Sequence, residues 1–166
     1  MSYEKIAESL RLTSELYDQL IELSVQKKEA IIRNRMDDIM QLLARESRLL
    51  KRMAEAEKLR TEAVRQFQQQ EGYLSREPMT LWVVSKLVSN PAQKTALQDG
   101  IRRLAEQAEQ LRRLNETNQL LVQQALDFVD LTLDLLVGPS EEAVYHDPTA
   151  QTPYTNQRAG LYDFKA

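Results

Sequence analysis

The stretch LRRLNETNQLLVQQALDFVDLTLDLL, from Leu111 to Leu136, has the spacing of one long amphipathic helix. Its inward-facing positions, followed from Leu104 onward, recur at alternating steps of four and three residues, which is the seam of a helix that packs against other helices. The members of this seam are Leu104, Ala108, Leu111, Asn115, Asn118, Val122, Ala125 and Val129. Asn115 and Asn118 place amides where such a seam normally carries leucine.

Two interpretations of these asparagines stay open from the sequence. In the first, they are buried and set the helix register, at a cost in stability. In the second, this part of the seam is open and the amides hydrogen-bond to an incoming helix. A second stripe repeats every seven residues on an adjacent face, with the members Leu114, Leu121, Phe128 and Leu135. Such a broad apolar surface has to be covered by the protein's own helices, by its tail or by a partner.

The composition favours long helices in a single domain and excludes several classes of function. The 166 residues include only four glycines and five prolines. With no cysteine in the chain, disulfides, thiolate metal sites and thiol nucleophiles are excluded, which fits a reducing cytosol. The net charge of -3 argues against broad binding to nucleic acid or anionic lipid. Because no apolar run is long enough to cross a bilayer, we expect no direct membrane insertion. The missing cysteines favour a cytoplasmic protein.

Two further long helices precede the quoted stretch, over about Tyr3–Arg33 and Met36–Gln70. The first carries the stripe Ile6, Leu10, Thr13, Tyr17, Leu20, Ser24 and Ile31, widened by Leu12, Leu16, Leu23 and Ala30. For the second we expect the inward-facing residues Met36, Ile39, Leu42, Leu43, Leu49, Leu50, Met53, Ala56, Ala63, Val64 and Phe67. Between them, Asn34 suits the end of one helix, and Asp37 and Asp38 suit the start of the next. This predicts an antiparallel hairpin; one continuous helix with a phase shift is the alternative.

A short helix is expected between the second and third long helices. Gly72 ends the second helix, and Pro78 suits an early position of a short helix. That helix would cap the bundle through Leu81, Trp82, Val84, Leu87 and Val88. Asn90 and Pro91 then mark the boundary of the third long helix, which is expected over about Ala92–Val137.

The pattern changes at Gly138, and no helical or strand period continues from there to Ala166. The segment is nevertheless rich in bulky apolar residues, namely Tyr145, Tyr154, Leu161, Tyr162 and Phe164. We expect it to be disordered alone and ordered when bound. The predicted fold is therefore all-α: an elongated antiparallel bundle of three long helices with a short connecting helix over residues 1–137, and a flexible partner-binding tail over residues 138–166.

Motifs that carry chemistry are missing from the sequence. The single histidine, His146, has Glu142 four residues before it, but no second ligand accompanies them, so we predict no metal site. The chain contains neither a glycine-rich phosphate loop nor a Gly-x-Ser-x-Gly nucleophile elbow. We therefore expect no enzymatic activity, no catalytic residues and no cofactor.

The tripeptide RRL occurs twice, starting at Arg102 and at Arg112, and raises the question of nucleic-acid binding. Acidic residues at Glu106, Glu109 and Glu116 alternate with these arginines, and no aromatic side chain that could stack on bases lies nearby. The pattern favours a solvated helix face and no nucleic-acid partner.

Three segments of the chain resemble the FlgN family of flagellar export chaperones. Residues 20–60, LIELSVQKKEAIIRNRMDDIMQLLARESRLLKRMAEAEKLR, resemble the first helical hairpin of that family. Residues 115–136, NETNQLLVQQALDFVDLTLDLL, resemble its Asn-x-x-Asn-x-x-Leu helix with the bulky apolar run that follows. Residues 153–166, PYTNQRAGLYDFKA, are similar to tails of its Gram-positive members. The resemblance thus covers nearly the whole chain.

The resemblance implies a cytosolic, non-enzymatic chaperone of flagellar type III secretion. Such a chaperone binds the C-terminal helical segments of the hook–filament junction proteins (hook-associated proteins), prevents their premature assembly and delivers them to the export gate. The tail tyrosine that docks to the gate would be Tyr145 or Tyr154, of which only Tyr154 has a later glycine, Gly160. The expected partner-binding residues are Asn115, Asn118, Leu121, Phe128, Leu135, Tyr145, Tyr154, Leu161, Tyr162 and Phe164.

Two other functions compete with this one. The apolar faces also suit a structural coiled-coil subunit that assembles with itself, so a homo-oligomer stays open. A helical nucleic-acid or regulatory factor is the other alternative, and it would require salt-sensitive binding to nucleic acid.

Overall fold

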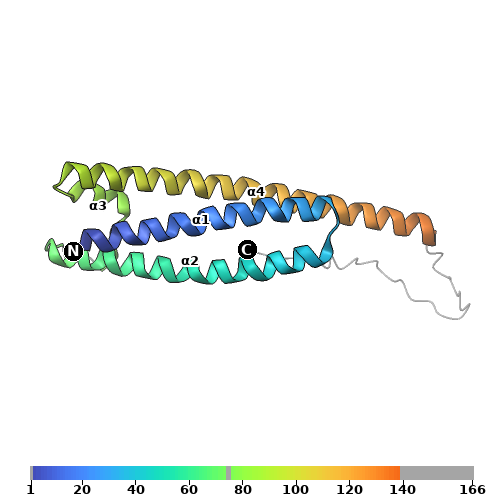
Figure 1. Cartoon of the computed structure of the whole chain (residues 1–166), viewed down its shortest axis with the longest axis horizontal. Helices are drawn as coiled ribbons and strands as arrows, with labels where there is room; N and C mark the ends of the chain where they lie inside the picture. Colours follow the sequence, from blue (N-terminus) through green and yellow to red (C-terminus); the bar gives the residue numbers. More distant parts are fainter. Residues whose placement is uncertain (1, 74–75, 139–166) are drawn as a thin grey trace, which may run out of the picture. The chain divides into compact units, whose positions relative to one another are not determined.

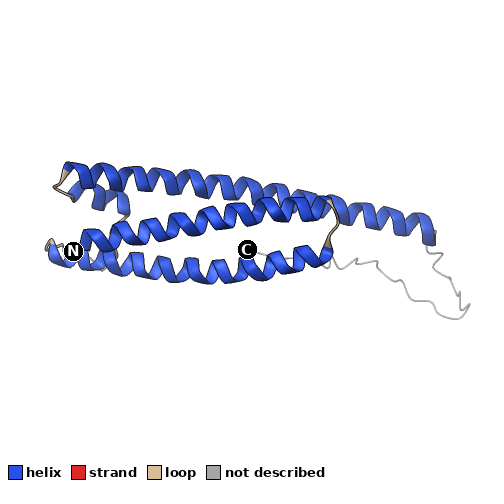
Figure 2. Ribbon diagram, in the orientation of Figure 1, coloured by secondary structure: helices blue, strands red, loops and turns tan. Residues whose placement is uncertain are grey.

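The computed structural model describes residues 2–73 and 76–138 of the chain. Its helices are α1 (Ser2–Ile32), α2 (Met36–Gln70), α3 (Leu81–Leu87) and α4 (Pro91–Val137), and the described residues contain no strand (Figure 2). The three long helices and the short connecting helix confirm the predicted all-α bundle. The chain divides at Val129: residues 1–129 form one compact unit, and the second begins at Asp130.

Helices α1 and α2 form the predicted antiparallel hairpin, and no continuous helix runs through their junction (Figure 1). Asn34 occupies the left-handed backbone region with φ 52°, which asparagine tolerates better than most residues. The amide N–H of Arg35 donates to the carbonyl oxygen of Ala30 at 2.9 Å and closes the end of α1. Asp37 and Asp38 lie in the first turn of α2, where negative carboxylates stabilise the helix by interacting with its free N–H groups.

The contact between α1 and α2 is mainly apolar. On α2, the apolar residues at steps of three, four and seven positions are buried or half-buried, namely Ile39, Leu42, Leu49, Met53, Ala56, Ala63 and Phe67. On α1, the buried apolar residues are Ile6, Leu10, Leu16, Leu20, Leu23 and Ala30. A half-buried ion pair crosses the hairpin, with Nζ of Lys27 2.7 Å from Oε1 of Glu46. Apolar burial of this kind is the main source of stability in a helical hairpin.

The prediction was wrong for three residues of α2. Met36, Leu43 and Leu50 were expected to face inward, and all three are exposed. The apolar arc of α2 is wider than the seam that one neighbouring helix can cover. Helix α1 covers one seam, and the adjacent apolar face stays in solvent.

All four helices meet in one apolar cluster at the end of the molecule where α1 begins. Its buried members are Ile6, Leu10, Ala63, Val64, Phe67, Leu81, Val84, Val88 and Leu97. The buried amide of Gln68 holds the connector beside it: its Nε2 donates to the carbonyl of Glu77 at 3.1 Å, and its Oε1 accepts from the N–H of Met79 at 3.2 Å. The connector is thereby tied to α2.

Helix α3 starts later than predicted and buries less. Thr80 caps it by accepting a hydrogen bond from the N–H of Val83 at 3.4 Å, so Pro78 lies before the helix and not within it. Trp82, which was expected to cap the bundle, is half exposed, and Lys86 lies 5.7 Å from its ring centre. A helix of seven residues can turn only one narrow face inward, and Leu81 and Val84 occupy that face.

The predicted end of α2 and start of α4 are confirmed, and both depend on residues next to the boundary. After α2, Gly72 has φ 76°, and the N–H of Tyr73 donates to the carbonyl of Gln68 at 2.9 Å, as in a Schellman cap. At the start of α4, Oδ1 of Asn90 accepts from the N–H of Ala92 at 2.9 Å, while Pro91 occupies the first helical position.

Candidate partner-binding surface

Helix α4 runs in the same direction as α1 and is joined to it by polar side chains (Figure 1). The centre of this contact is Gln107, which is buried. Its Nε2 donates to the carbonyl of Ser14 at 3.1 Å and to Oδ1 of Asp18 at 2.6 Å, while its Oε1 accepts from Oγ of Ser14 at 3.0 Å. Arg103 adds an exposed ion pair with Asp18 at 3.0 Å. The α1–α4 contact is therefore directional, because each amide group fits one position along the partner helix.

Gln107, Ser14 and Asp18 were not predicted to take part in this contact. Polar residues are usually exposed, so their burial was not expected. The one feature of the sequence that indicates the contact is the spacing of Ser14 and Asp18, which are four residues apart and therefore share a face of α1.

The two asparagines of the seam also contact α1. Asn118 is only 4% exposed, and its Nδ2 donates to the backbone carbonyl of Ser24 at 3.0 Å. Asn115 is half-buried, and its Oδ1 lies 3.4 Å from the hydroxyl of Ser24. The small, fully buried Ser24 leaves room for both amides. This geometry corresponds to the register-setting interpretation; their contact with a partner helix stays a prediction.

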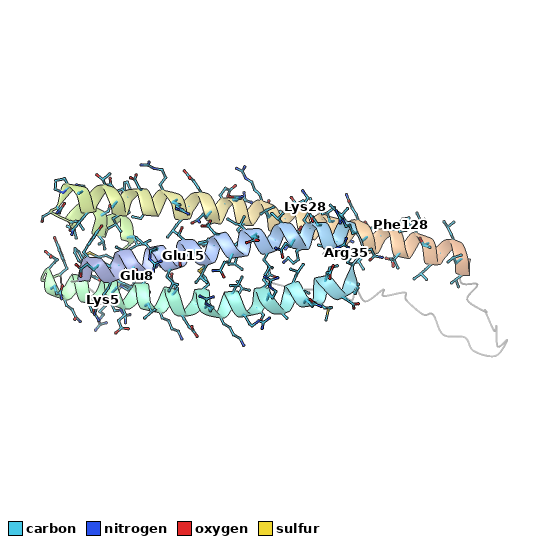
Figure 3. The ribbon with its side chains drawn as sticks, in the orientation of Figure 1. Lys5, Glu8, Glu15, Lys28, Arg35 and Phe128 are labelled. Atoms are coloured by element: carbon cyan, nitrogen blue, oxygen red, sulfur yellow. The ribbon has the colours of Figure 1, made fainter. Side chains whose placement is uncertain are left out.

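Coverage of α4 ends after Asn118, the last buried residue of this helix in the described chain. Leu121 is still half-buried, but the following apolar residues up to Val129 are exposed: Val122, Leu126, Phe128 and Val129, together with the preceding Leu120. Phe128, labelled on α4 in Figure 3, is 69% exposed. Because these exposed apolar groups are large, this part of α4 is the candidate surface for a binding partner.

The described part of the second unit, from Asp130 to Gly138, is also rich in exposed apolar residues. They are Leu131, Leu133, Leu135, Leu136 and Val137, and Leu135 is 77% exposed. None of the described helices is long and apolar enough to cross a membrane. The tail residues predicted to bind partners, Tyr145, Tyr154, Leu161, Tyr162 and Phe164, lie outside the described residues, as does His146.

Of the arginines in the RRL repeats, Arg102, Arg112 and Arg113 pair with carboxylates of α4 itself, and Arg103 pairs with Asp18 of α1. Glu109 accepts hydrogen bonds from Arg112 at 2.8 Å and from Arg113 at 2.9 Å. These bonds lower the pKa of Glu109 to about 2, and Arg112 also pairs with Glu116. On α1, Arg11 pairs in the same way with Glu8 and Glu15, the two glutamates labelled in Figure 3. Such paired, solvated charges favour the predicted polar face over a nucleic-acid surface.

Comparison with known proteins decides the family. A family model described as FlgN protein matches residues 1–153. The chain belongs to the FlgN family. A protein of Bacillus subtilis (strain 168) named Uncharacterized protein YvyG is 23% identical over 166 residues, which is the full length of both chains. No solved structure matches.

Membership of the FlgN family indicates a chaperone in flagellum biogenesis that binds flagellar substrate proteins. The family is one of chaperones and not of enzymes. Within the described residues, no group of three or more His, Asp or Glu side chains is arranged to hold a metal ion.

Proposed function

We propose that this FlgN-family protein binds the C-terminal helical segments of flagellar hook–filament junction proteins on the exposed apolar part of α4. Binding keeps these segments from assembling prematurely, and the protein then delivers them to the flagellar type III export gate. The observation that supports this proposal is the change in coverage at Asn118: α4 is packed against α1 up to this residue and presents large apolar side chains after it.

The physical basis is the docking of one amphipathic helix on another. Leu121, Phe128 and Leu135 recur every seven residues, so they supply anchors at the spacing that the apolar face of a client helix requires. A client segment that polymerises through its apolar face is blocked while that face is covered. Release needs no nucleotide, because a moderate affinity allows handover by mass action.

The tail is assigned two roles in this proposal. Leu161, Tyr162 and Phe164 add apolar contacts to the bound client, and one of Tyr145 and Tyr154 docks the export gate. A segment that orders only on binding lowers the net affinity by the conformational entropy it loses, which suits a complex that must be released.

Calorimetry with C-terminal peptides of both junction proteins tests the proposal. The full-length chain should bind at least one peptide, and Phe128→Ser should weaken binding about tenfold or more because it removes a central anchor. Leu59→Ser is the matched control, since Leu59 is similarly exposed but lies on α2. Failure of the full-length chain to bind either peptide would sink the proposal. Equal losses in both variants would instead move the binding surface away from α4.

A version ending at Val137 separates the roles of the tail. Weaker peptide binding by this version would make the tail part of the client contact. Unchanged binding would leave recognition on the helices and assign the tail to the gate alone.

A further inference from the structure

A second exposed apolar stripe lies on α2. Its positions alternate by four and three residues over the N-terminal half of the helix, and every one of them is exposed: Met36, Met40, Leu43, Ser47, Leu50 and Ala54. Each position from Met40 onward follows directly after a residue of the α2 seam that faces α1, so the stripe occupies the adjacent face. This spacing is that of a helix–helix seam, and the hairpin itself does not use it.

The charges along one edge of this stripe have opposite signs at its two ends. Asp37 lies beside Met36, Ala44 beside Leu43, and Lys51 beside Leu50. Both Asp37 and Lys51 are exposed, and neither has an ion-pair partner among the described residues. Arg11 and Arg112, which are also exposed, pair with carboxylates of their own helices.

We propose that this stripe pairs with the same stripe of a second copy of the chain, with the two α2 helices antiparallel. In this register Met36 packs on the partner subunit's Ala54 and Met40 on the partner subunit's Leu50. Leu43 packs on the partner subunit's Ser47. Large side chains thereby face small ones at both ends and at the centre, which lets the two helices interdigitate.

The antiparallel register also brings the unpaired charges together. Asp37 meets the partner subunit's Lys51, and by symmetry the same ion pair forms twice, as an interface with a two-fold axis requires. The axis passes near Ala44, whose small side chain allows close approach. In a parallel pair the two copies of this edge would lie on opposite sides of the interface, so Asp37 and Lys51 would not meet. The charge pattern therefore favours a second copy over an unrelated helix, and it does not depend on the proposed chaperone function.

Charge reversal of the full-length chain tests the pairing by analytical ultracentrifugation. Asp37→Lys alone and Lys51→Glu alone each place like charges opposite one another twice, so each variant should dimerise about tenfold or more weakly than the unchanged chain. A mixture of the two variants restores both ion pairs and should dimerise within about threefold of the unchanged chain. Glu62→Lys is the control, because Glu62 is exposed on α2 but lies beyond the end of the stripe.

Two outcomes would overturn the proposal: an unchanged chain that stays monomeric at every accessible concentration, or a dimer that both reversals leave intact. The apolar half of the interface has its own test. Leu50→Gln should weaken dimerisation, whereas Leu59→Gln, an equally exposed leucine of α2 outside the stripe, should not. Equal effects of the two would also contradict the proposal.

The orientation is measurable by crosslinking because the chain contains no cysteine. A mixture of Met36→Cys and Ala54→Cys chains should give a disulfide-linked heterodimer, and each chain alone should give little. The reverse result would show a parallel pair and overturn the antiparallel register.

Discussion

Helix α1 has two long neighbours, and the two contacts are built from different chemistry. Against α2 it presents leucines, with the half-buried ion pair Lys27–Glu46 across the same contact. Against α4 it presents Ser14, Asp18 and Ser24 to the amides of Gln107 and Asn118. Apolar packing supplies most of the folding free energy, whereas hydrogen bonds contribute less net energy and more positional selectivity. The hairpin is thus the stable part of the molecule, and the polar contact sets where α4 lies along it.

The largest expected effect is loss of the apolar contact. Leu42 is 7% exposed and packs in a cluster with Leu23 and Ala30. Leu42→Ala should lower the free energy of unfolding by about 2–5 kcal/mol, through lost burial and the cavity left behind. Urea denaturation followed by circular dichroism measures it. Leu59→Ala is the control and should cost less than about 1 kcal/mol because Leu59 is exposed. Equal costs would contradict the assigned seam.

Loss of the polar contact should have a smaller effect. Gln107→Ala removes three hydrogen bonds to α1, one of them to the carboxylate of Asp18, and should lower the free energy of unfolding by about 1–2 kcal/mol. Gln110→Ala changes an exposed residue on the next turn of α4 and serves as the control in the same denaturation experiment. If the two variants unfold alike, Gln107 does not hold α4 to α1.

Replacing an asparagine of the α4 seam by leucine should raise the free energy of unfolding, whereas the two preceding substitutions lower it. Oδ1 of Asn118 is buried without a hydrogen-bond partner among the described residues. The carbonyl of Ser24 keeps its bond within α1 when the amide is removed. Asn118→Leu should therefore raise the free energy of unfolding by about 1 kcal/mol. The half-buried Asn115 should respond less to the same change. A decrease of similar size for Asn118→Leu would show that the amide is needed for folding.

The smallest expected effect concerns Gly100 within α4. A methyl group there would have its nearest atom in another residue at 3.8 Å, on Leu10, which is ordinary van der Waals contact. Gly100→Ala should raise the free energy of unfolding by about 0.5–1 kcal/mol, because glycine loses more backbone entropy in a helix. Gly72→Ala should lower it instead, since Gly72 has φ 76°. Thermal unfolding of both variants tests the opposite signs.

Features set by short-range chemistry could be predicted from the sequence. The bounds of α2 and the asparagines at the hairpin turn and at the start of α4 depend on residues a few positions apart. The choice between Leu42 and Leu43 could not be predicted, because both lie on the apolar arc of α2 and only the position of α1 decides which is buried. Likewise, the role of Gln107 depends on Ser14, which lies 93 residues away in the sequence.

The separation in sequence between the contacting groups also bears on how the chain acquires its structure. The hydrogen bonds between α1 and α4 join residues 85 to 94 positions apart, whereas the turn between α1 and α2 has only three residues. Closing a short loop loses little chain entropy, so the hairpin should form first, even while the ribosome is still adding α4. We therefore expect α4 to dock last, onto an α1 surface on which Ser14 and Ser24 are already in place to bond to Gln107 and Asn118.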